Sequence, residues 1–492
     1  MLRRLAQSEP SRARAPVLSD CVCAAERTPS DERTMTRVDE SRAGGRTVAL
    51  ARPGGGWRWL AAVVLLAGAA GCNSDDASPA TSEADSTAGP SDALTYFRDV
   101  KPILDAKCVQ CHQVGSVGPF DFTDPDTVFE LREAVVAAVS SRSMPPWPPA
   151  QDCTEYLGDR SLSSEQIDVI AAWVEEGGEL GDPAQEGEAL PEAPTYGLSR
   201  SDHTLEMESP YVPTAAPDDY RCFVIDWPEA ESSFVTGLRF NAGEPRLVHH
   251  AIAYVTGPEN ADAIEALENA DAQGGYDCFG GPEVPAGWLG VWVPGAVGGD
   301  FPVDTGVRVE PGSKVVLQIH YAANPSGWVD QTSIEVSTEA QVEREAWIQP
   351  WMDPAWFAPE GLTIPAGDPA MRVSTALDPV FFIGDSEPLT VHTAGLHMHL
   401  LGSQGRLSIE RADGSEECLL DIPDWDFYWQ GAYALAEPRE LQLGDRIRIE
   451  CQWDNTAENQ PIIDGAAVTP ADTVWGEGTL DEMCLGAFYL SK

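Results

Sequence analysis

The chain has 492 residues and a formal net charge of -48, from 31 Lys and Arg against 79 Asp and Glu. This balance argues against nucleic acid and anionic lipid headgroups as partners, and it favours cationic partners only slightly because soluble surfaces are commonly acidic. The length predicts two or three domains. Segments rich in Val, Ile, Trp and Tyr, separated by Pro and Gly, dominate the second half and predict mostly β structure there.

The first 72 residues predict an export signal. A twelve-residue apolar run, residues 59–70, is too short to span a membrane and ends just before Cys72. The small residues before Cys72 resemble a bacterial lipobox, which implies a lipoprotein of a Gram-negative cell envelope, on the periplasmic face or the cell surface, that meets the membrane only through its lipid anchor. Plain secretion is the alternative, and Met35 is an alternative start because the leader is long. Residues 73–92 are predicted to be a flexible tether.

Export predicts a compartment in which disulfide bonds are permitted. Of the eleven cysteines, two fall in the leader, Cys72 is the predicted lipid site, and two belong to the motif described next. The other six permit up to three bonds: Cys153, Cys222, Cys278, Cys418, Cys451 and Cys484. Their number alone does not determine the pairing.

The sequence CVQCH at residues 108–112 is the strongest local motif in the chain. Two cysteines three apart on a helical turn can both reach the vinyl groups of one haem, and His112 can turn inward as an axial ligand of the iron. The segment 93–182 holds no second ligand pair for zinc, and a disulfide redox motif would not require the histidine. The motif therefore predicts a covalent haem c on Cys108 and Cys111.

The surroundings of this motif resemble the cytochrome c family. Residues 96–108 have the apolar spacing of a helix that runs into the motif, and residues 163–178 open with a serine cap and close at paired glycines. The resemblance implies a small all-α haem domain at residues 93–182. It also implies that Met144, in the proline-rich loop 141–149, is the second axial ligand of the haem iron, although a lone Met is more often core filler. His/Met ligation suits one-electron transfer.

A linker at residues 183–197, rich in Pro, Gly and Glu, precedes a part that holds seven of the eight histidines. In GLHMHLLG, residues 395–402, two histidines share one face of an extended chain, which suits a metal ion and equally suits the wet face of a strand. The adjacent histidines at 249–250 would face opposite ways on a regular strand, so they predict a bulge or a strand end if both bind one ion. The candidate ligands are His249, His250, His320, His397, His399 and Met483.

The order HH, LQIHY, HxH and DEMC resembles the copper type II, ascorbate-dependent monooxygenase family over about residues 200–490. The resemblance implies two mostly antiparallel, jelly-roll-like β-sandwich domains, at residues 198–335 and 336–492, each with one copper site and with solvent between the sites. It assigns the electron-transfer copper to His249, His250 and His320, and the catalytic, dioxygen-binding copper to His397, His399 and Met483. It also implies the bonds Cys222–Cys278 and Cys451–Cys484, and it leaves the pairing of Cys153 and Cys418 open, a bond between these two being one option.

The activity implied by the resemblance is hydroxylation of a C–H bond of a small organic or peptide-like substrate by dioxygen. Its cofactors would be two copper ions, one haem c and a reductant, either an ascorbate-like donor or a redox partner protein. Copper prefers imidazole, and a thioether ligand favours Cu(I). The fused haem would be a built-in one-electron donor, and we expect it to feed the copper of His249, His250 and His320.

Two departures weigh against peptide amidation. Gly395 stands where the peptide-amidating member of the family has a substrate-binding arginine, and Leu485 and Ala487 replace an assisting asparagine and tyrosine. Residues 421–433 could line a pocket for an apolar or cationic ligand, and they fit a structural hairpin equally well. A non-catalytic haem and copper electron carrier, or a copper-binding lipoprotein, would share every ligand and is the alternative function.

Overall fold

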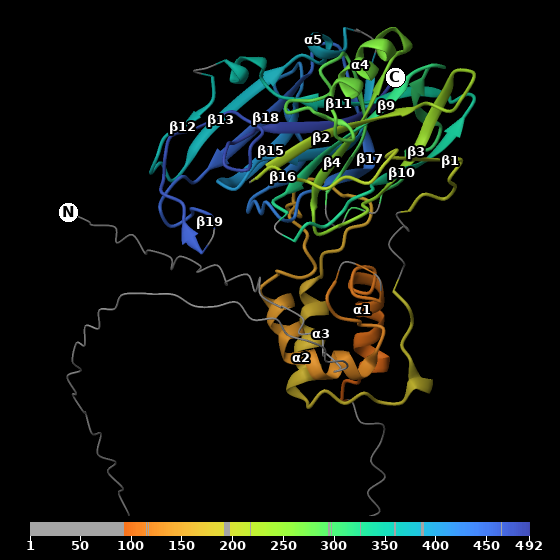
Figure 1. Ribbon diagram of the computed structural model, residues 1–492. Helices are drawn as coiled ribbons and strands as arrows, with labels where there is room; N and C mark the ends of the chain where they lie inside the picture. The colour runs from red at the N-terminus through yellow and green to blue at the C-terminus, as the bar shows by residue number, and fades with distance from the viewer. Residues whose placement is uncertain are drawn as a thin grey trace, which may run out of the picture. The chain divides into compact units, whose positions relative to one another are not determined.

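The computed structural model describes residues 93–114, 116, 118–190, 197–216, 218–293, 296, 298–324, 326–358, 361–384, 388–463 and 465–492 (Figure 1). The predicted leader, Cys72 and the tether lie outside these residues. The described part is mostly antiparallel β-sheet, with a small helical part at residues 93–190. None of its helices has the length and apolar character that a membrane crossing needs.

The helical part has its own apolar core, which includes Tyr96, Leu104, Ile170 and Trp173. Its elements are η1 Tyr96–Val100, α1 Lys101–Lys107, α2 Pro125–Ser140, α3 Ser164–Glu175 and η2 Pro183–Gln185. The predicted serine cap is confirmed, because Ser163 forms a reciprocal capping box with Gln166 at the start of α3. The predicted helix before the motif is also present, and α1 ends where Cys108 begins the CVQCH sequence.

Between α2 and α3 the chain packs against the β-rich part. We call residues 147–157 the strap. A disulfide joins Cys153 of the strap to Cys418, and the backbone N–H of Leu157 donates to the carbonyl of Ala434 over 2.8 Å. The strap is therefore attached to the second half of the β-rich part both covalently and by hydrogen bonds.

The strands of the first half lie in one sheet together with β11 Arg344–Trp351 of the second half, in the order β1-β10-β3-β8-β11-β6-β4-β9-β2-β5, with β7 beside β3. Its strands are β1 His203–Glu206, β2 Asp218–Asp226, β3 Ser233–Asn241, β4 Val248–Thr256, β5 Tyr276–Asp277, β6 Gly287–Trp292, β7 Gly299–Asp300, β8 Thr305–Val309, β9 Lys314–Ala322 and β10 Ser333–Glu339. The helices η3 Pro258–Asn260 and α4 Ala261–Ala270 follow β4. Strand β9 lies between β4 and β2, and its inner residues are all buried, which explains its continuous apolar run.

The second half continues this sheet, because β22 pairs with both β11 and β14, and β14 pairs with β17. Its longer strands are β11 Arg344–Trp351, β13 Met371–Leu377, β14 Leu389–His397, β15 Gly402–Glu410, β16 Glu416–Ile422, β17 Ala432–Leu441, β18 Arg446–Trp453 and β22 Leu485–Ser491. The shorter elements are η4 Pro354–Phe357, β12 Thr363–Ile364, α5 Pro379–Ile383, β19 Ile462–Ile463, β20 Ala466–Ala467 and β21 Thr473–Val474. A second sheet, in the order β13-β18-β15-β16, shares one apolar core with β14 and β22.

The two halves of the β-rich part meet in a continuous sheet rather than at a linker. The expected boundary between residues 335 and 336 falls inside β10, which stays paired with β3 as far as Glu339. Strand β11 then pairs with β8 of the first half on one edge and with β22 of the second half on the other. This shared sheet fixes the position of one half against the other.

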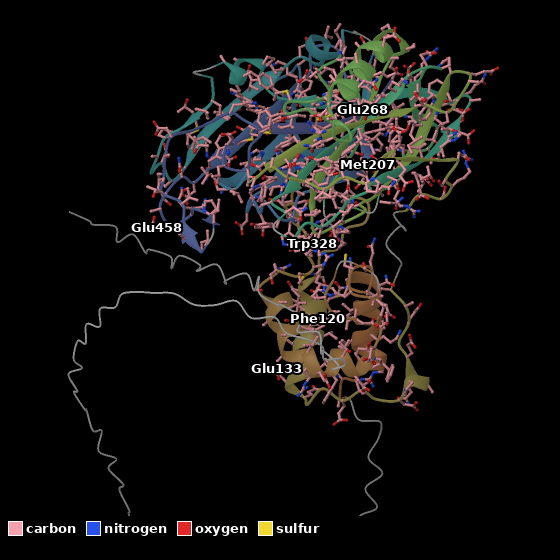
Figure 2. All side chains as sticks on the ribbon, in the orientation of Figure 1. Phe120, Glu133, Met207, Glu268, Trp328 and Glu458 are labelled. Carbon is pink, nitrogen blue, oxygen red and sulfur yellow. A yellow bond between two sulfur atoms is a disulfide. The ribbon has the colours of Figure 1, made fainter. Side chains whose placement is uncertain are left out.

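Among the described residues three disulfide bonds are formed, Cys153–Cys418, Cys222–Cys278 and Cys451–Cys484, and Figure 2 draws sulfur atoms in yellow. The bonds Cys222–Cys278 and Cys451–Cys484 agree with the expectation from the family resemblance, and Cys153–Cys418 joins the two cysteines whose pairing the sequence left open. Disulfides persist in oxidising compartments, so they indicate a chain that folds outside the reducing cytoplasm.

Candidate metal centre

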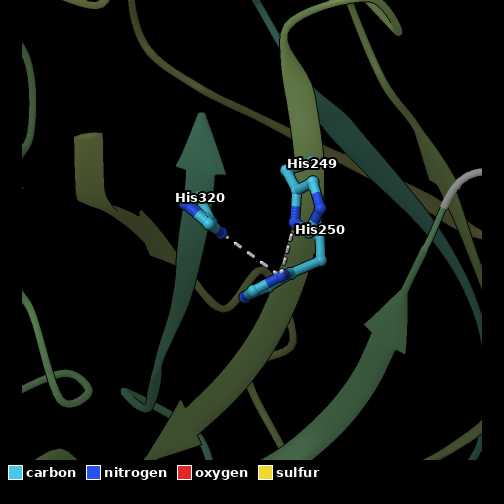
Figure 3. A group of neighbouring side chains, drawn as sticks. All are labelled: His249, His250 and His320. Carbon is cyan, nitrogen blue, oxygen red and sulfur yellow. Dashed lines mark hydrogen bonds between the residues drawn. The ribbon is translucent and has the colours of Figure 1, made fainter. Parts of the chain in front are cut away.

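Three histidines converge where β4 and β9 run side by side (Figure 3). His250 is directly opposite His320 across the two strands, and the register shifts between Val248 and His250. This bulge confirms the prediction from the adjacent histidines, because it lets His249 and His250 turn towards the same point. The Nδ1 atom of His250 lies 3.3 Å from Nδ1 of His249 and 3.4 Å from Nδ1 of His320.

These distances suit a single metal ion. Two nitrogens that each lie about 2.0 Å from one ion at a tetrahedral angle are about 3.3 Å apart. Burial, and then the neighbouring histidines, lower the pKa of His249 to about 4 and hold the pKa of His250 well below its usual value. Both rings are therefore neutral at pH 7 and keep a lone pair for a metal. The three residues could hold an ion through their Nδ1 atoms.

Asp218, on β2, sets the orientation of the His320 ring. Its carboxylate lies 2.9 Å from Nε2 of His320, which leaves Nδ1 of that ring facing the other histidines. Tyr220 stacks on the same ring, with the centroids 4.1 Å apart. Asp218 also accepts a 2.6 Å hydrogen bond from the hydroxyl of Thr479. Burial alone would raise the pKa of Asp218, but the contacts with His320 and Thr479 hold it at about 2, so the carboxylate is charged.

A second pair of histidines lies at the end of β14. The Nε2 atoms of His397 and His399 are 3.1 Å apart. Their other ring nitrogens face outward, since Nδ1 of His397 lies 2.5 Å from the amide oxygen of Gln430 and Nδ1 of His399 lies 2.9 Å from the carbonyl oxygen of Asp481. These partners hold the rings so that the two Nε2 atoms converge. Burial lowers the pKa of both histidines, that of His399 to about 3, so both are neutral at pH 7.

Met483 lies in the segment that enters β22 beside this pair. Leu485, two residues further on, is directly opposite His397 in the pairing of β14 with β22. The Met483 side chain is buried, and the next residue, Cys484, is bonded to Cys451 of β18. The sheet register and the disulfide therefore bring the Met483 backbone to the neighbourhood of His397 and His399.

The buried carboxylate of Glu482, the residue before Met483, accepts hydrogen bonds from the backbone around His399. It accepts the N–H of His399 over 2.9 Å, the N–H of Leu401 over 2.6 Å and the indole N–H of Trp453 over 2.8 Å. Burial raises its pKa to about 7, against the lowering effect of these hydrogen bonds. Glu482, the residue before Met483, therefore holds the His399 turn and Trp453 of β18 against the segment that leads into β22.

The two groups of histidines are neighbours. The ring centroids of His250 and His397 are 6.2 Å apart, and Phe427 stacks on His249 at 5.0 Å and approaches His399 at 6.1 Å. The family resemblance implies two copper sites with solvent between them, whereas here five imidazoles form one cluster. We call this set of five rings the histidine cluster.

Sequence reasoning missed the residues that orient these rings. Gln430 and Phe427 lie in the aromatic segment 421–433, which the sequence singled out without assigning them a role. Asp218 carries no local signal, because its position beside His320 follows only from the pairing of β2 with β9. The other two histidines of the β-rich part have ordinary partners, since His203 contacts the Glu229 carboxylate and His392 contacts the Ser491 hydroxyl.

In the helical part, the thiols of Cys108 and Cys111 are both free. The ring of His112 stacks on Phe122 with the centroids 4.6 Å apart, and its Nδ1 atom is buried without a hydrogen-bond partner. A side chain at Gly118 would collide with this ring, so glycine is required there. Met144 lies in the turn after α2, where its backbone N–H donates to a carbonyl of that helix. These contacts do not join Met144 to His112.

No protein-family model matches the chain, and neither does any curated protein. Among solved structures, the major capsid protein P2 of bacteriophage PM2 is 10% identical, with 59% of this chain and 96% of that chain covered and a TM-score of 0.24. A secreted protein of Parabacteroides distasonis is 7% identical, with 59% and 87% covered and a TM-score of 0.13. The VP2 subviral particle of infectious bursal disease virus is 9% identical, with 63% and 75% covered and a TM-score of 0.15. Similarities this low support no conclusion about this chain.

Proposed function

We propose that the chain is a copper-dependent monooxygenase that hydroxylates a C–H bond of a small organic or peptide-like substrate with dioxygen. The observation that carries the proposal is the histidine cluster, in which five buried or half-buried imidazoles from three strands meet. In His320, His397 and His399, one ring nitrogen contacts an oxygen outside the cluster. The other ring nitrogen of each then faces the cluster. Neutral imidazoles with converging lone pairs are expensive to bury and suit a metal ion.

The donor atoms fit copper. His249, His250 and His320 would hold one ion through their Nδ1 atoms, and His397 and His399, with Met483, would hold the other through Nε2 and sulfur. Imidazole suits copper in either oxidation state, and a thioether favours Cu(I). When bound, copper supplies one-electron redox chemistry and reactivity towards dioxygen. The unlike ligand sets favour catalysis over storage, because storage has no need of such an asymmetry.

The chain's own residues have separate tasks in this proposal. Three groups fix which ring nitrogens point inward, namely Asp218, Gln430 and the Asp481 carbonyl. Glu482 holds the backbone of His399 close to that of Met483. Phe427 covers His249 and limits the access of water to that side of the cluster. The net reaction consumes a C–H bond, dioxygen, two electrons and two protons, and it gives an alcohol and water.

The helical part would be a cytochrome c-like electron donor in this proposal. Two free thiols at the CVQCH motif and a buried, unpartnered imidazole nitrogen on His112 suit covalent haem c, with His112 as an axial ligand and Met144 as the second. Two one-electron deliveries would supply the electrons of one turnover. The β-rich halves would then be jelly-roll-like copper domains, and Cys72 would anchor the chain to the cell envelope.

Oxygen consumption tests the proposal. Purified full-length protein loaded with copper should take up dioxygen in step with hydroxylated product when a reductant and a member of a substrate panel are added. The His399→Ala variant should bind less copper and lose the activity, whereas His203→Ala, outside the cluster, should retain both. Copper and haem bound without substrate-dependent oxygen uptake across the panel would favour the non-catalytic electron carrier.

A further inference from the structure

The strap attaches the helical part to β16 and β17, and β17 pairs with β14, whose last residue is His397. Besides the bonds already described, the backbone N–H of Ala150 donates to the Asp421 carbonyl over 2.8 Å, and the Tyr156 hydroxyl donates to the Leu419 carbonyl over 3.1 Å. Tyr156 also belongs to the apolar core of the second half. These contacts join the strap to β16 and to the start and middle of β17.

Trp147 opens the strap close to the predicted haem ligand. It follows Met144 by three residues, and a chain spans at most about 3.3–3.6 Å per residue, so the Cα atoms of Met144 and Trp147 lie within about 11 Å of each other. The Trp147 ring packs edge-on against the ring of Tyr433 with the centroids 5.3 Å apart, and the guanidinium of Arg160 lies over the indole. Met144 is therefore connected to Tyr433 by the covalent segment 144–147 and by one aromatic contact.

Tyr433 leads directly to the second ligand pair. It is buried, and it is opposite Ala394 in the pairing of β17 with β14, three residues before His397. Gln430, three residues before Tyr433 on the same chain, contacts Nδ1 of His397. A continuous path of covalent bonds, one ring contact and one hydrogen bond thus joins the Met144 turn to the His397 imidazole.

From this path we infer that electrons pass from the helical part to the His397, His399 and Met483 ligand set through the contact between Trp147 and Tyr433. The inference rests on the proposed function and specifies where electrons arrive. It differs from the expectation from sequence, which directed them to His249, His250 and His320. In each transfer one ferrous haem becomes ferric and one Cu(II) becomes Cu(I), and no bond is made or broken. Tunnelling is faster through bonds and packed rings than across a solvent gap, and the strap supplies such a medium.

Flash reduction tests this inference without substrate or dioxygen. In anaerobic, fully oxidised full-length protein with haem and copper bound, a photoreduced flavin delivers one electron to the haem, and the decay of the ferrous haem absorbance is followed with the loss of the Cu(II) spectrum. We expect Trp147→Leu to slow the decay by about tenfold, because loss of the ring contact with Tyr433 weakens the electronic coupling between the two centres. Trp147→Phe, which keeps a ring against Tyr433, should restore most of the rate.

Trp328→Leu is the matched control. Trp328 is a half-buried tryptophan of the first half, labelled in Figure 2, and an arginine, Arg246, covers it as Arg160 covers Trp147. This variant should leave the decay unchanged. In His397→Ala, which should lack the second copper, the fast decay should disappear even though the first ligand set is intact.

Three results would overturn the inference. They are a decay in Trp147→Leu equal to that of the unaltered protein, a decay slowed equally in Trp328→Leu, and a fast decay that survives His397→Ala. Unaltered protein that binds no covalent haem or no copper would instead overturn the proposed function itself, before any variant is compared. The native haem spectrum of each variant shows that its helical part has folded.

Discussion

The two ligand groups of the histidine cluster are built on the same sheet but are supported differently. In the first group, a charged carboxylate, that of Asp218, contacts the outer nitrogen of His320. In the second, neutral oxygens, those of Gln430 and the Asp481 carbonyl, contact the outer nitrogens of His397 and His399. A carboxylate partner makes an imidazole a more electron-rich ligand, whereas neutral partners and a thioether favour a softer, less charged ion.

The groups also differ in how their backbones are held. Strands β4 and β9 form a long ladder that carries all three histidines of the first group. The second group combines the end of β14 with the segment before β22, and it depends on Glu482 and the Cys451–Cys484 bond to hold these pieces together. The difference teaches that two paired strands with one bulge hold the backbone of three ligands by their own ladder, whereas ligands at strand ends need added restraints.

The largest expected effect is the loss of an ion. We expect His320→Ala to remove the first copper and His399→Ala to remove the second, so that each variant binds one ion per chain where the unaltered protein binds two. Elemental analysis after copper loading and dialysis measures this directly. If either substitution empties both sites, the histidine cluster is one centre and the comparison of two groups fails.

The next largest effect distinguishes two disulfide bonds by their influence on the copper site. Removing either Cys451–Cys484 or Cys222–Cys278 by paired Ser substitutions should lower the free energy of unfolding by about 2–5 kcal/mol. Only the first removal should also weaken the copper–sulfur signal in X-ray absorption of the Cu(I) protein, because Cys484 is adjacent to Met483. The Cys222–Cys278 variant is thus the control for general loss of stability. An unchanged signal in both variants would show that the bond beside Met483 does not position its sulfur.

A smaller effect is expected from the carboxylate of the first group. Asp218→Asn should weaken Cu(II) binding there by about 10–100-fold, since partners of metal-bound histidines contribute on this scale, and should change Cu(I) binding less. Isothermal titration with each oxidation state gives both values. Asp226→Asn, at the other end of β2 with a side chain that is 84% exposed, is the matched control and should leave both affinities unchanged.

The smallest effect is expected from the neutral partner of the second group. Gln430→Leu should weaken Cu(I) binding at His397 and His399 by about tenfold, the lower end of the range for such partners, because an uncharged amide is lost. A competition titration with a Cu(I) chelator measures it, with Gln442→Leu, at an exposed position in the turn after β17, as the control. A loss equal to that of Asp218→Asn would show that the charge of the partner does not distinguish the two groups.

Much of the local structure could be predicted from the sequence. The capping box at Ser163, the bulge at His249 and His250 and the burial of the β9 run follow from interactions within a few residues or from a single hydrophobic period. Two of the disulfide pairs, Cys222–Cys278 and Cys451–Cys484, were expected correctly because of a family resemblance, whereas the sequence left the pairing of Cys153 and Cys418 open. Cys72 lies outside the described residues, so its lipidation stays a prediction.

The sequence by itself determined which side chains are available: five imidazoles in apolar runs, a methionine beside a cysteine, and a CVQCH motif on a helical turn. Only the tertiary structure decided that Asp218 faces His320, that Gln430 faces His397, that the strap lies on β16 and β17, and that His250 and His397 are neighbours. These contacts join residues far apart in the chain, and they depend on the register of β2 with β9 and of β22 between β11 and β14. A local pattern fixes the period of a strand, but the partner and register of that strand are set by packing of the whole sheet.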